Sequence, residues 1–322
     1  MIHLWDEAPR IEILGVQVYS YGLYCAIGAL MAAAAVLILS RGTGQKKGTG
    51  LLTACLGILC GTLGARVFFC VLDTIGGSGI PFADWCNLST GGFSLFGMIL
   101  GVFFAAWISA KVTGGETALL LDTVSCAIPL AIAAERIGER LIDGFDISRT
   151  VKDVFPAGTF LAVENAFYGT SALATWLVSA ALSIILFLVL TFSLLRKNHR
   201  NGDQWIMLLL LCGAGGVILE SLRYDYHLEY SFVYFQQIIA ALMLLWGLIQ
   251  AGRRGKRKGL FIAAILSFAA AAAICGGVEF ALDRMNISHI VLYLVMTAAL
   301  ALPVTLGMIL LTGKDAKGTV NR

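Results

Sequence analysis

Long apolar runs separated by short polar segments dominate the pattern of the chain. A helix needs about 20 apolar residues to cross the hydrocarbon core of a bilayer. Nine runs are of roughly this length, at residues 17–40, 50–72, 91–110, 117–135, 171–195, 204–222, 231–250, 260–282 and 288–312. The pattern therefore predicts an all-α polytopic membrane protein with about nine transmembrane helices.

The fourth run is the weakest of the nine. It contains Asp122 and Pro129, and it continues directly into charged sequence. Irregular backbone at membrane depth is tolerated where it is buried in protein or lines a water-filled cavity. The pattern therefore leaves open a re-entrant or broken helix at residues 117–135.

The composition agrees with a membrane protein. Of 322 residues, 58% are hydrophobic and 13% are charged, whereas soluble domains carry about 25% charged residues. There are eight cysteines but no CxxC pair and no metal-ligand spacing of His and Cys, so neither a disulfide framework nor a metal site is predicted. The membrane is a predicted partner, and nucleic acid is not.

Segments rich in lysine and arginine alternate with poor ones along the chain. The rich segments follow the first, third, fifth and seventh runs and end the chain: Arg41, Lys46, Lys47, Lys111, Arg196, Lys197, Arg200, Arg253, Arg254, Lys256, Arg257, Lys258, Lys314, Lys317 and Arg322. Short cytoplasmic loops carry an excess of Lys and Arg. The alternation therefore predicts an N-terminus outside and a C-terminus in the cytoplasm.

Charged sequence directly after the fourth run is the first candidate site. Acidic and basic residues follow the apolar run without a spacer: Glu135, Arg136, Glu139, Arg140, Asp143, Asp146 and Arg149. On a helix, Arg136, Glu139 and Asp143 would share one face, together with Arg140. Charges at membrane depth pair internally, face water or hold a charged ligand. We interpret this segment as a binding site.

A second charged cluster ends the sixth run. Glu220 and Arg223 are neighbours at helical spacing, Asp225 follows, and Gln236 lies early in the next run. One interpretation is anchoring of helix ends at the membrane interface. The other is a ligand site, because both clusters are predicted at the outer face. Two arginines oriented by carboxylates suit a phosphate-bearing lipid headgroup.

Two further features lie in the second and third runs. Glycines at short helical spacing, Gly57 with Gly61 and Gly64 and then Gly97 with Gly101, predict close packing of two helices. Arg66 is an ionisable residue inside a run, where it requires a partner or water. The sequence leaves a functional and a structural role for Arg66 equally open.

Four stretches occur in a defined order along the chain. They are residues 18–28 with Tyr21-Gly-Leu, the glycine-rich residues 91–97 with Gly92 and Ser94, residues 135–138, and residues 219–225 followed by Gln236. In this order they resemble the motifs of the prolipoprotein diacylglyceryl transferase family, over roughly residues 11–250. The stretch at 219–225 is the most specific match.

The resemblance implies a transferase in the bacterial cytoplasmic membrane. Such an enzyme moves diacylglyceryl from phosphatidylglycerol to the lipobox cysteine thiol of a secreted preprolipoprotein and releases glycerol phosphate. The phospholipid-binding residues that it implies are Arg223, Arg136, Tyr21, Gly92, Ser94 and Gln236. Attack by a thiol needs a base, for which the expected carboxylates are Glu220, Asp225 and Glu139, with His227 as an alternative. No cofactor is implied.

Several positions depart from the family pattern. Phe96 stands where the family has a histidine, Glu135 where its signature has the first glycine, and Glu139 where it has an asparagine. Histidine supplies a base or a hydrogen-bond partner near neutral pH, and phenylalanine does not. The chain also continues beyond the family's usual end, through residues 253–322.

The resemblance divides the chain near residue 252. Residues 1–252 are expected to form a family-like transmembrane core of seven helices. Residues 136–170 are expected to be an extracytoplasmic loop within that core, and long loops are often functional. Residues 253–322 are expected to be a C-terminal extension with two transmembrane helices.

Three functions stay open at this point. The first is the lipid-modifying transferase, and the second is a non-catalytic or differently acting lipid-binding homologue. The third is a small-molecule transporter, with which Arg66 and Asp122 inside the runs are compatible, although no inverted repeat supports it. Release of glycerol phosphate from labelled phosphatidylglycerol would separate the first function from the other two.

Overall fold

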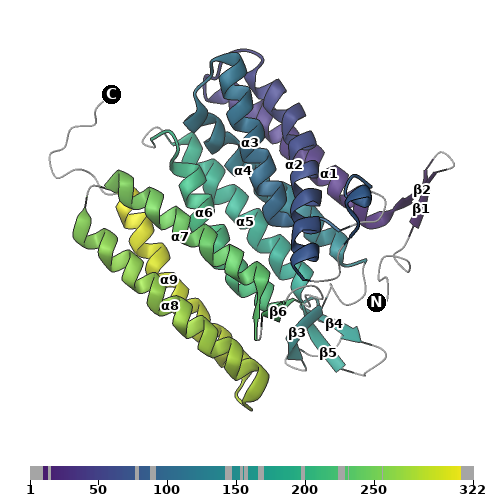
Figure 1. Ribbon diagram of the computed structural model, residues 1–322, viewed down its shortest axis with the longest axis vertical. Helices are drawn as coiled ribbons and strands as arrows, with labels where there is room; N and C mark the ends of the chain where they lie inside the picture. The colour runs from purple at the N-terminus through teal and green to yellow at the C-terminus, as the bar shows by residue number, and fades with distance from the viewer. Residues whose placement is uncertain are drawn as a thin grey trace. The chain divides into compact units, whose positions relative to one another are not determined.

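The helices of the computed structural model follow the nine apolar runs (Figure 1). Its described residues are 10–13, 16–76, 80–87, 92–141, 147–152, 155, 159–165, 170–196, 200–223, 229–230, 232–255 and 257–312. Within them the helices are α1 (Ser20–Gly42), α2 (Thr49–Ile75), α3 (Leu95–Thr113), α4 (Thr117–Glu139), α5 (Thr175–Leu195), α6 (Asp203–Leu222), α7 (Phe235–Gly255), α8 (Lys258–Arg284) and α9 (His289–Thr312). Each is long and apolar enough to cross a bilayer, which confirms the predicted all-α, multi-pass membrane fold.

The fourth helix is continuous. Because α4 runs unbroken to Glu139 with Pro129 inside it, the alternative of a re-entrant or broken helix is wrong. Arg140 is the C-cap of α4, so the helical face expected from the charged segment stops there. Asp143 and Asp146 lie outside the described residues.

The chain divides into two compact units. The first comprises Met1–Trp205 and Leu222–Leu228, and the second comprises Ile206–Ser221 and Glu229–Arg322. In the first unit α1 packs on α2 and α4, α2 packs on α3, and α4 packs on α5. Small and aliphatic side chains of α1 to α4 form its core: Val36, Ala54, Ala106, Ala110, Leu120, Val124 and Ala127. The division near residue 252 stays a prediction.

The helices α2 and α3 approach each other closely at their glycines. A Cβ atom added to Gly97 would lie 2.3 Å from the carbonyl oxygen of Gly64. One added to Gly101 would lie 2.0 Å from the carbonyl oxygen of Cys60. Any side chain at these two positions would force the two backbones apart, which confirms the packing role predicted for them. Nothing lies within 4 Å of a Cβ atom added to Gly57, so the predicted packing role of that glycine is wrong.

Arg66 holds the segment that leads into α3. Its guanidinium donates to the carbonyl oxygens of Asp84 at 3.1 Å, Trp85 at 3.2 Å and Gly92 at 3.3 Å. Asp84 lies in a short 3-10 helix, η1 (Phe82–Asp84), and Gly92 lies just before α3. These bonds support the structural role of Arg66 over the functional one.

Asp122 caps the first turn of α6. Its carboxylate is fully buried and accepts hydrogen bonds from the backbone N–H groups of Gly202, Gln204 at 2.9 Å and Trp205 at 3.1 Å. The first N–H groups of a helix have no partner within the helix and carry partial positive charge, so a carboxylate suits this position. The buried charge of Asp122 therefore has a structural explanation.

Short strands lie at the end of the first unit where α1 begins and α4 ends (Figure 1). β1 (Arg10–Ile13) pairs antiparallel with β2 (Val16–Tyr19), which leads directly into α1. β3 (Ile147–Lys152), β5 (Thr170–Ala174) and β4 (Ala162–Asn165) form an antiparallel sheet in that order. A loop was expected at 136–170, and its strands were not predicted.

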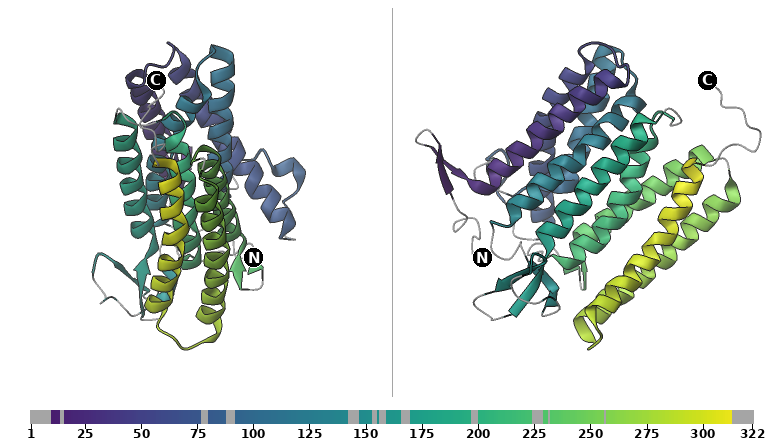
Figure 2. Two further views of the ribbon diagram at one scale, coloured as in Figure 1. Left: turned by 90° about the vertical axis from the view of Figure 1, so that its left-hand side faces the viewer. Right: turned by 180° about the vertical axis from the view of Figure 1, so that it is seen from behind.

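The second unit consists of most of α6 together with α7, α8 and α9. A Cβ atom added to Gly213 of α6 would lie 2.9 Å from the carbonyl oxygen of Ala240 of α7, so these helices touch through backbone. α8 and α9 pack along each other as an antiparallel pair (Figure 2). β6 (Glu229–Tyr230) and β7 (Val233–Tyr234) form a two-stranded hairpin before α7.

Candidate functional site

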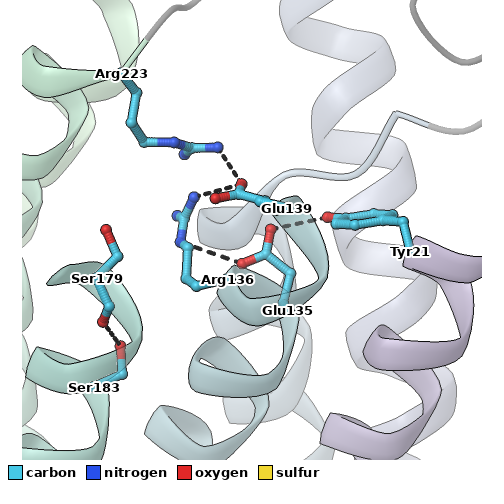
Figure 3. A network of polar contacts seen from close by, with 7 residues as sticks. All are labelled: Tyr21, Glu135, Arg136, Glu139, Ser179, Ser183 and Arg223. Atoms are coloured by element: carbon cyan, nitrogen blue, oxygen red, sulfur yellow. Dashed lines mark hydrogen bonds and ion pairs between the residues drawn. The ribbon is translucent and has the colours of Figure 1, made fainter. Parts of the chain in front are cut away.

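Four charged side chains and one tyrosine of the first unit form a connected network at the end of α4 (Figure 3). Within α4, Arg136 Nε lies 3.2 Å from Glu135 Oε2, and Arg136 Nη1 lies 2.8 Å from Glu139 Oε1. The contact with Glu139 follows from the helix, because residues three apart share a face. We call Tyr21, Glu135, Arg136, Glu139 and Arg223 the Arg136 network.

Arg223 joins this network from the residue after α6. Its Nη2 atom donates to Glu139 Oε1, the same oxygen that accepts from Arg136. A single carboxylate oxygen therefore holds two guanidinium groups. The charged segment after the fourth run and the cluster after the sixth are 84 residues apart in sequence at this contact, and the structure brings them together.

Tyr21 of α1 completes the network. Its hydroxyl donates to Glu135 Oε1 at 2.9 Å and points towards it in Figure 3. The close approach of α1 to α4 depends on Gly138, where an added Cβ would lie 2.8 Å from Tyr24 Cβ and 3.3 Å from Tyr21 Cδ2. A glycine at this position of α4 therefore lets the tyrosines of α1 pack against the charged turn.

The network is largely buried, with Tyr21 and Glu135 half-buried, and the formal charges of its members balance. Arg136 and Glu139 are 4% and 3% exposed, and the side chain of Arg223 is 12% exposed. Within the network as described, two guanidinium groups face two carboxylates, so each of its charges has an opposite charge beside it. Pairing of this kind offsets the desolvation of buried ions, but removing one partner leaves the other charge uncompensated.

A cavity of about 590 Å³ borders the network between α1, α2, α3 and α4. Tyr21 and Glu135 belong to both, whereas most of the remaining lining is aliphatic or glycine. On α4 the lining extends from Glu135 to Val124, which is about 16 Å along a helix axis. One leaflet of a bilayer core is about 15 Å thick, so the cavity has the length and polarity for an acyl chain with its polar end at Tyr21.

The segment before α3 forms part of the cavity wall. Ser94 lines the cavity, and its side chain accepts from the N–H of Gly97 at the start of α3. Gly92 has a φ of +78°, and a Cβ there would lie 2.3 Å from the ring of Phe69. Both residues have clear local structural roles, and their predicted part in phospholipid binding stays a prediction.

Phe96 lies inside the protein, at the second residue of α3. It is 4% exposed, at the position where the family pattern has a histidine. A phenyl ring neither accepts nor donates a proton, so any proton transfer at this site falls to other groups.

The remaining predicted residues lie elsewhere. Glu220 and Gln236 belong to the second unit, where Glu220 is buried and Gln236 is half-buried. Asp225 and His227 lie outside the described residues. The neighbouring Gln237 was not predicted, although it is buried and accepts from Tyr234 N at 3.0 Å. Because Gln236 and Gln237 are adjacent, the sequence does not indicate which of the two side chains faces the interior.

The fold and site define a class: a multi-pass membrane protein whose buried ion network borders a mostly apolar, lipid-sized cavity. Residues 10–252 match the family model for prolipoprotein diacylglyceryl transferase, and the chain belongs to this family. The match to the family ends at residue 252, before the helices α8 and α9.

Curated relatives agree with the family. A phosphatidylglycerol–prolipoprotein diacylglyceryl transferase of Clostridium tetani is 26% identical over 246 residues, which is 74% of this chain and 93% of that protein. The phosphatidylglycerol–prolipoprotein diacylglyceryl transferase 2 of Clostridium perfringens is 24% identical, over 74% of this chain and 91% of that protein. A Clostridioides difficile transferase of the same name is 24% identical, over 76% and 93%.

Proposed function

We propose that this protein transfers diacylglyceryl from phosphatidylglycerol to the lipobox cysteine thiol of a secreted preprolipoprotein. The site is proposed at the outer face of the bacterial cytoplasmic membrane, because lysine and arginine alternate across the short loops. The names of the curated relatives support the donor and the class of acceptor.

One observation carries the proposal: Arg136 and Arg223 meet on one anion beside the polar end of the cavity. A guanidinium binds a phosphate through two parallel hydrogen bonds, as it binds a carboxylate. In our proposal the lipid phosphate binds these arginines, and an acyl chain occupies the cavity. Tyr21 and Ser94 line the cavity and would contact the lipid, and Gly92 and Gln236 are retained as proposed contacts.

The carboxylate of Glu139 sits where the arginines would hold that phosphate. We therefore propose an exchange in which the lipid phosphate displaces Glu139 from Arg223 and from Arg136. Both guanidinium groups keep an anionic partner, since one anion replaces another on them, and the site gains one negative charge until Glu139 takes up a proton. Its further consequence is that a carboxylate is released next to the bound headgroup.

The released carboxylate has a chemical use. The cysteine thiol gives its proton to Glu139, and the thiolate attacks the carbon of the diacylglycerol unit that carries the phosphate. The carbon–sulfur bond forms as the carbon–oxygen bond breaks, and glycerol phosphate leaves with the electron pair and one additional negative charge. Arg136 and Arg223 stabilise that developing charge. Glu220 and Asp225 remain the alternative bases.

The test uses the purified full-length protein with phosphatidylglycerol labelled in its headgroup glycerol. We expect glycerol phosphate release only with a lipobox peptide that contains cysteine, in equal amount to the diacylglyceryl peptide formed. A peptide with serine in place of that cysteine is the matched control. Equal release with the serine peptide, or none with the cysteine peptide, would contradict the proposed transfer.

Two observations favour a second candidate function, lipid binding without catalysis: Phe96 is buried, and both arginines of the Arg136 network are bound to Glu139. A homologue that binds phosphatidylglycerol without turning it over would keep the cavity and the arginines but would need no histidine. Retention of labelled lipid without glycerol phosphate release would favour this function. Transport is less well supported, because Arg66 and Asp122 bind backbone groups within the fold.

A further inference from the structure

The helices α8 and α9 each contribute a buried polar side chain to the second unit. Glu279 of α8 is 1% exposed, and its Oε1 atom accepts from Gln237 Nε2 of α7 at 2.7 Å. The same nitrogen donates to the carbonyl oxygen of Val217 in α6 at 3.1 Å. Glu279 is thereby linked to the last turns of α6 through one intervening amide.

Tyr293 of α9 makes the second link. Its hydroxyl lies 3.1 Å from Ser221 Oγ and 3.4 Å from the carbonyl oxygen of Ser221, which is fully buried. The last four carbonyl groups of a helix have no partner within it, and Ser221 is the second-last residue of α6. The tyrosine therefore satisfies a carbonyl at the end of α6.

Both links act on the same face of α6. Val217 and Ser221 are four residues apart, which places them one above the other on a helix. Two residues after Ser221 the chain reaches Arg223. Both Glu279 and Tyr293 lie beyond residue 252, where the family match ends.

We propose that α8 and α9 fix the end of α6 and thereby set the direction in which Arg223 leaves it. Glu279 and Tyr293 are then positioning residues that act through Arg223 and do not touch the substrate. This inference rests on the proposed function for its effect on turnover. A misplaced guanidinium holds the leaving phosphate less well, because such sites tolerate little positional error.

The first measurement is hydrogen exchange of the backbone amides of residues 217–223 in the full-length protein. Tyr293→Phe and Glu279→Leu should each speed exchange at the end of α6. Glu279→Gln keeps an acceptor for Gln237 and should restore the parental rate. Thr305→Val on α9 is the control, because Thr305 is exposed and its hydroxyl donates to the carbonyl oxygen of Ala301 in its own helix. Parental exchange in Tyr293→Phe and in Glu279→Leu would overturn the inference.

The second measurement is turnover of phosphatidylglycerol in a double-mutant cycle. Tyr293→Phe should lower kcat/KM by about two- to tenfold, the range expected for one hydrogen bond. In an Arg223→Lys background the same change should have little further effect, since the guanidinium that it positions is gone. Full additivity of the two changes would contradict positioning through Arg223.

The two proposals fail differently. If the parent protein releases no glycerol phosphate, the proposed function falls, and hydrogen exchange alone decides the role of α8 and α9. If the parent is active but Tyr293→Phe changes neither exchange nor kcat/KM, the positioning role falls and the transferase remains.

Discussion

Two buried arginines of the first unit, Arg66 and Arg136, differ in what they bind. Both lie inside transmembrane helices and are 1% and 4% exposed. Arg66 donates to backbone carbonyls of the segment before α3, whereas Arg136 contacts the carboxylates of Glu135 and Glu139. Carbonyls are neutral and fixed in the chain, but a carboxylate carries the charge of a phosphate and can rotate away.

We propose that this difference separates a structural arginine, Arg66, from a ligand-binding one, Arg136. The carbonyl oxygens of Asp84, Trp85 and Gly92 belong to the backbone, so an anion can replace them at Arg66 only if that backbone moves. At Arg136 and Arg223 the partner is a side chain, so an incoming phosphate can take its place without disturbing the backbone. Burial alone therefore does not identify a site, whereas the exchangeability of the partner does.

The largest effect that we expect is on folding, from Arg66→Leu. The change leaves the carbonyls of Asp84, Trp85 and Gly92 without their buried donor, which costs about 3 kcal/mol or more in the free energy of unfolding. The midpoint of thermal unfolding in detergent should fall by roughly 6–12 °C. A parental midpoint with lost turnover would instead show that Arg66 serves the chemistry.

The next effect is on turnover, and it compares the two arginines of the Arg136 network. Arg223→Lys should lower kcat/KM by about 10- to 100-fold, because lysine keeps the charge but loses the bidentate geometry. Arg136→Lys should cost less, since Arg136 is also engaged by Glu135 within its own helix. The comparison needs equal protein amounts. A larger loss at Arg136 would assign the main phosphate contact to the family signature.

A smaller effect is expected from Gly138→Ala. The added methyl group meets Tyr24 and the ring of Tyr21, so it should separate α1 from α4 and weaken the contact between Tyr21 and Glu135. Overpacking of this kind costs about 1–3 kcal/mol. We expect a lower unfolding midpoint together with a raised KM for phosphatidylglycerol. Gly276→Ala on α8, where nothing lies within 4 Å, is the matched control.

The smallest effect should come from Asp122→Asn. Asparagine keeps one oxygen to accept from Gln204 and Trp205 but loses the second oxygen, which accepts from Gly202. We therefore expect a loss of about 1 kcal/mol, from this hydrogen bond and from the weaker interaction with the helix dipole. Turnover should be parental once protein amounts are matched. A large loss of activity with an unchanged unfolding midpoint would show that Asp122 acts in function and not only as a cap.

The sequence predicted the helices because a transmembrane span leaves a long, uniform signal. It also placed Arg136 beside Glu139, since a spacing of three on a helix is a contact. The contact of Glu139 with Arg223 joins positions 84 residues apart, and no spacing rule predicts it. It arises from the packing of helices that the hydrophobic pattern does not specify.

Other features were missed for local reasons. The strands between residues 147 and 174 are short and lie between long apolar runs, so the hydrophobic pattern alone predicts a loop there. Thr150 and Val151 are residue types that favour a strand. The contact of Tyr21 with Glu135 depends on the space at Gly138, which only the packed helices reveal. The predicted role of Asp225 remains a prediction, because it lies outside the described residues.

Exchange of Glu139 for a lipid phosphate is best tested by lipid binding to the parent protein and to Glu139→Gln. Glutamine keeps an oxygen for the arginines but removes the competing charge. We expect phosphatidylglycerol to bind about tenfold more tightly to the variant, the size of one charged hydrogen bond. Diacylglycerol, which has no phosphate, should bind both proteins equally. Unchanged or weaker binding of phosphatidylglycerol by Glu139→Gln would contradict the exchange.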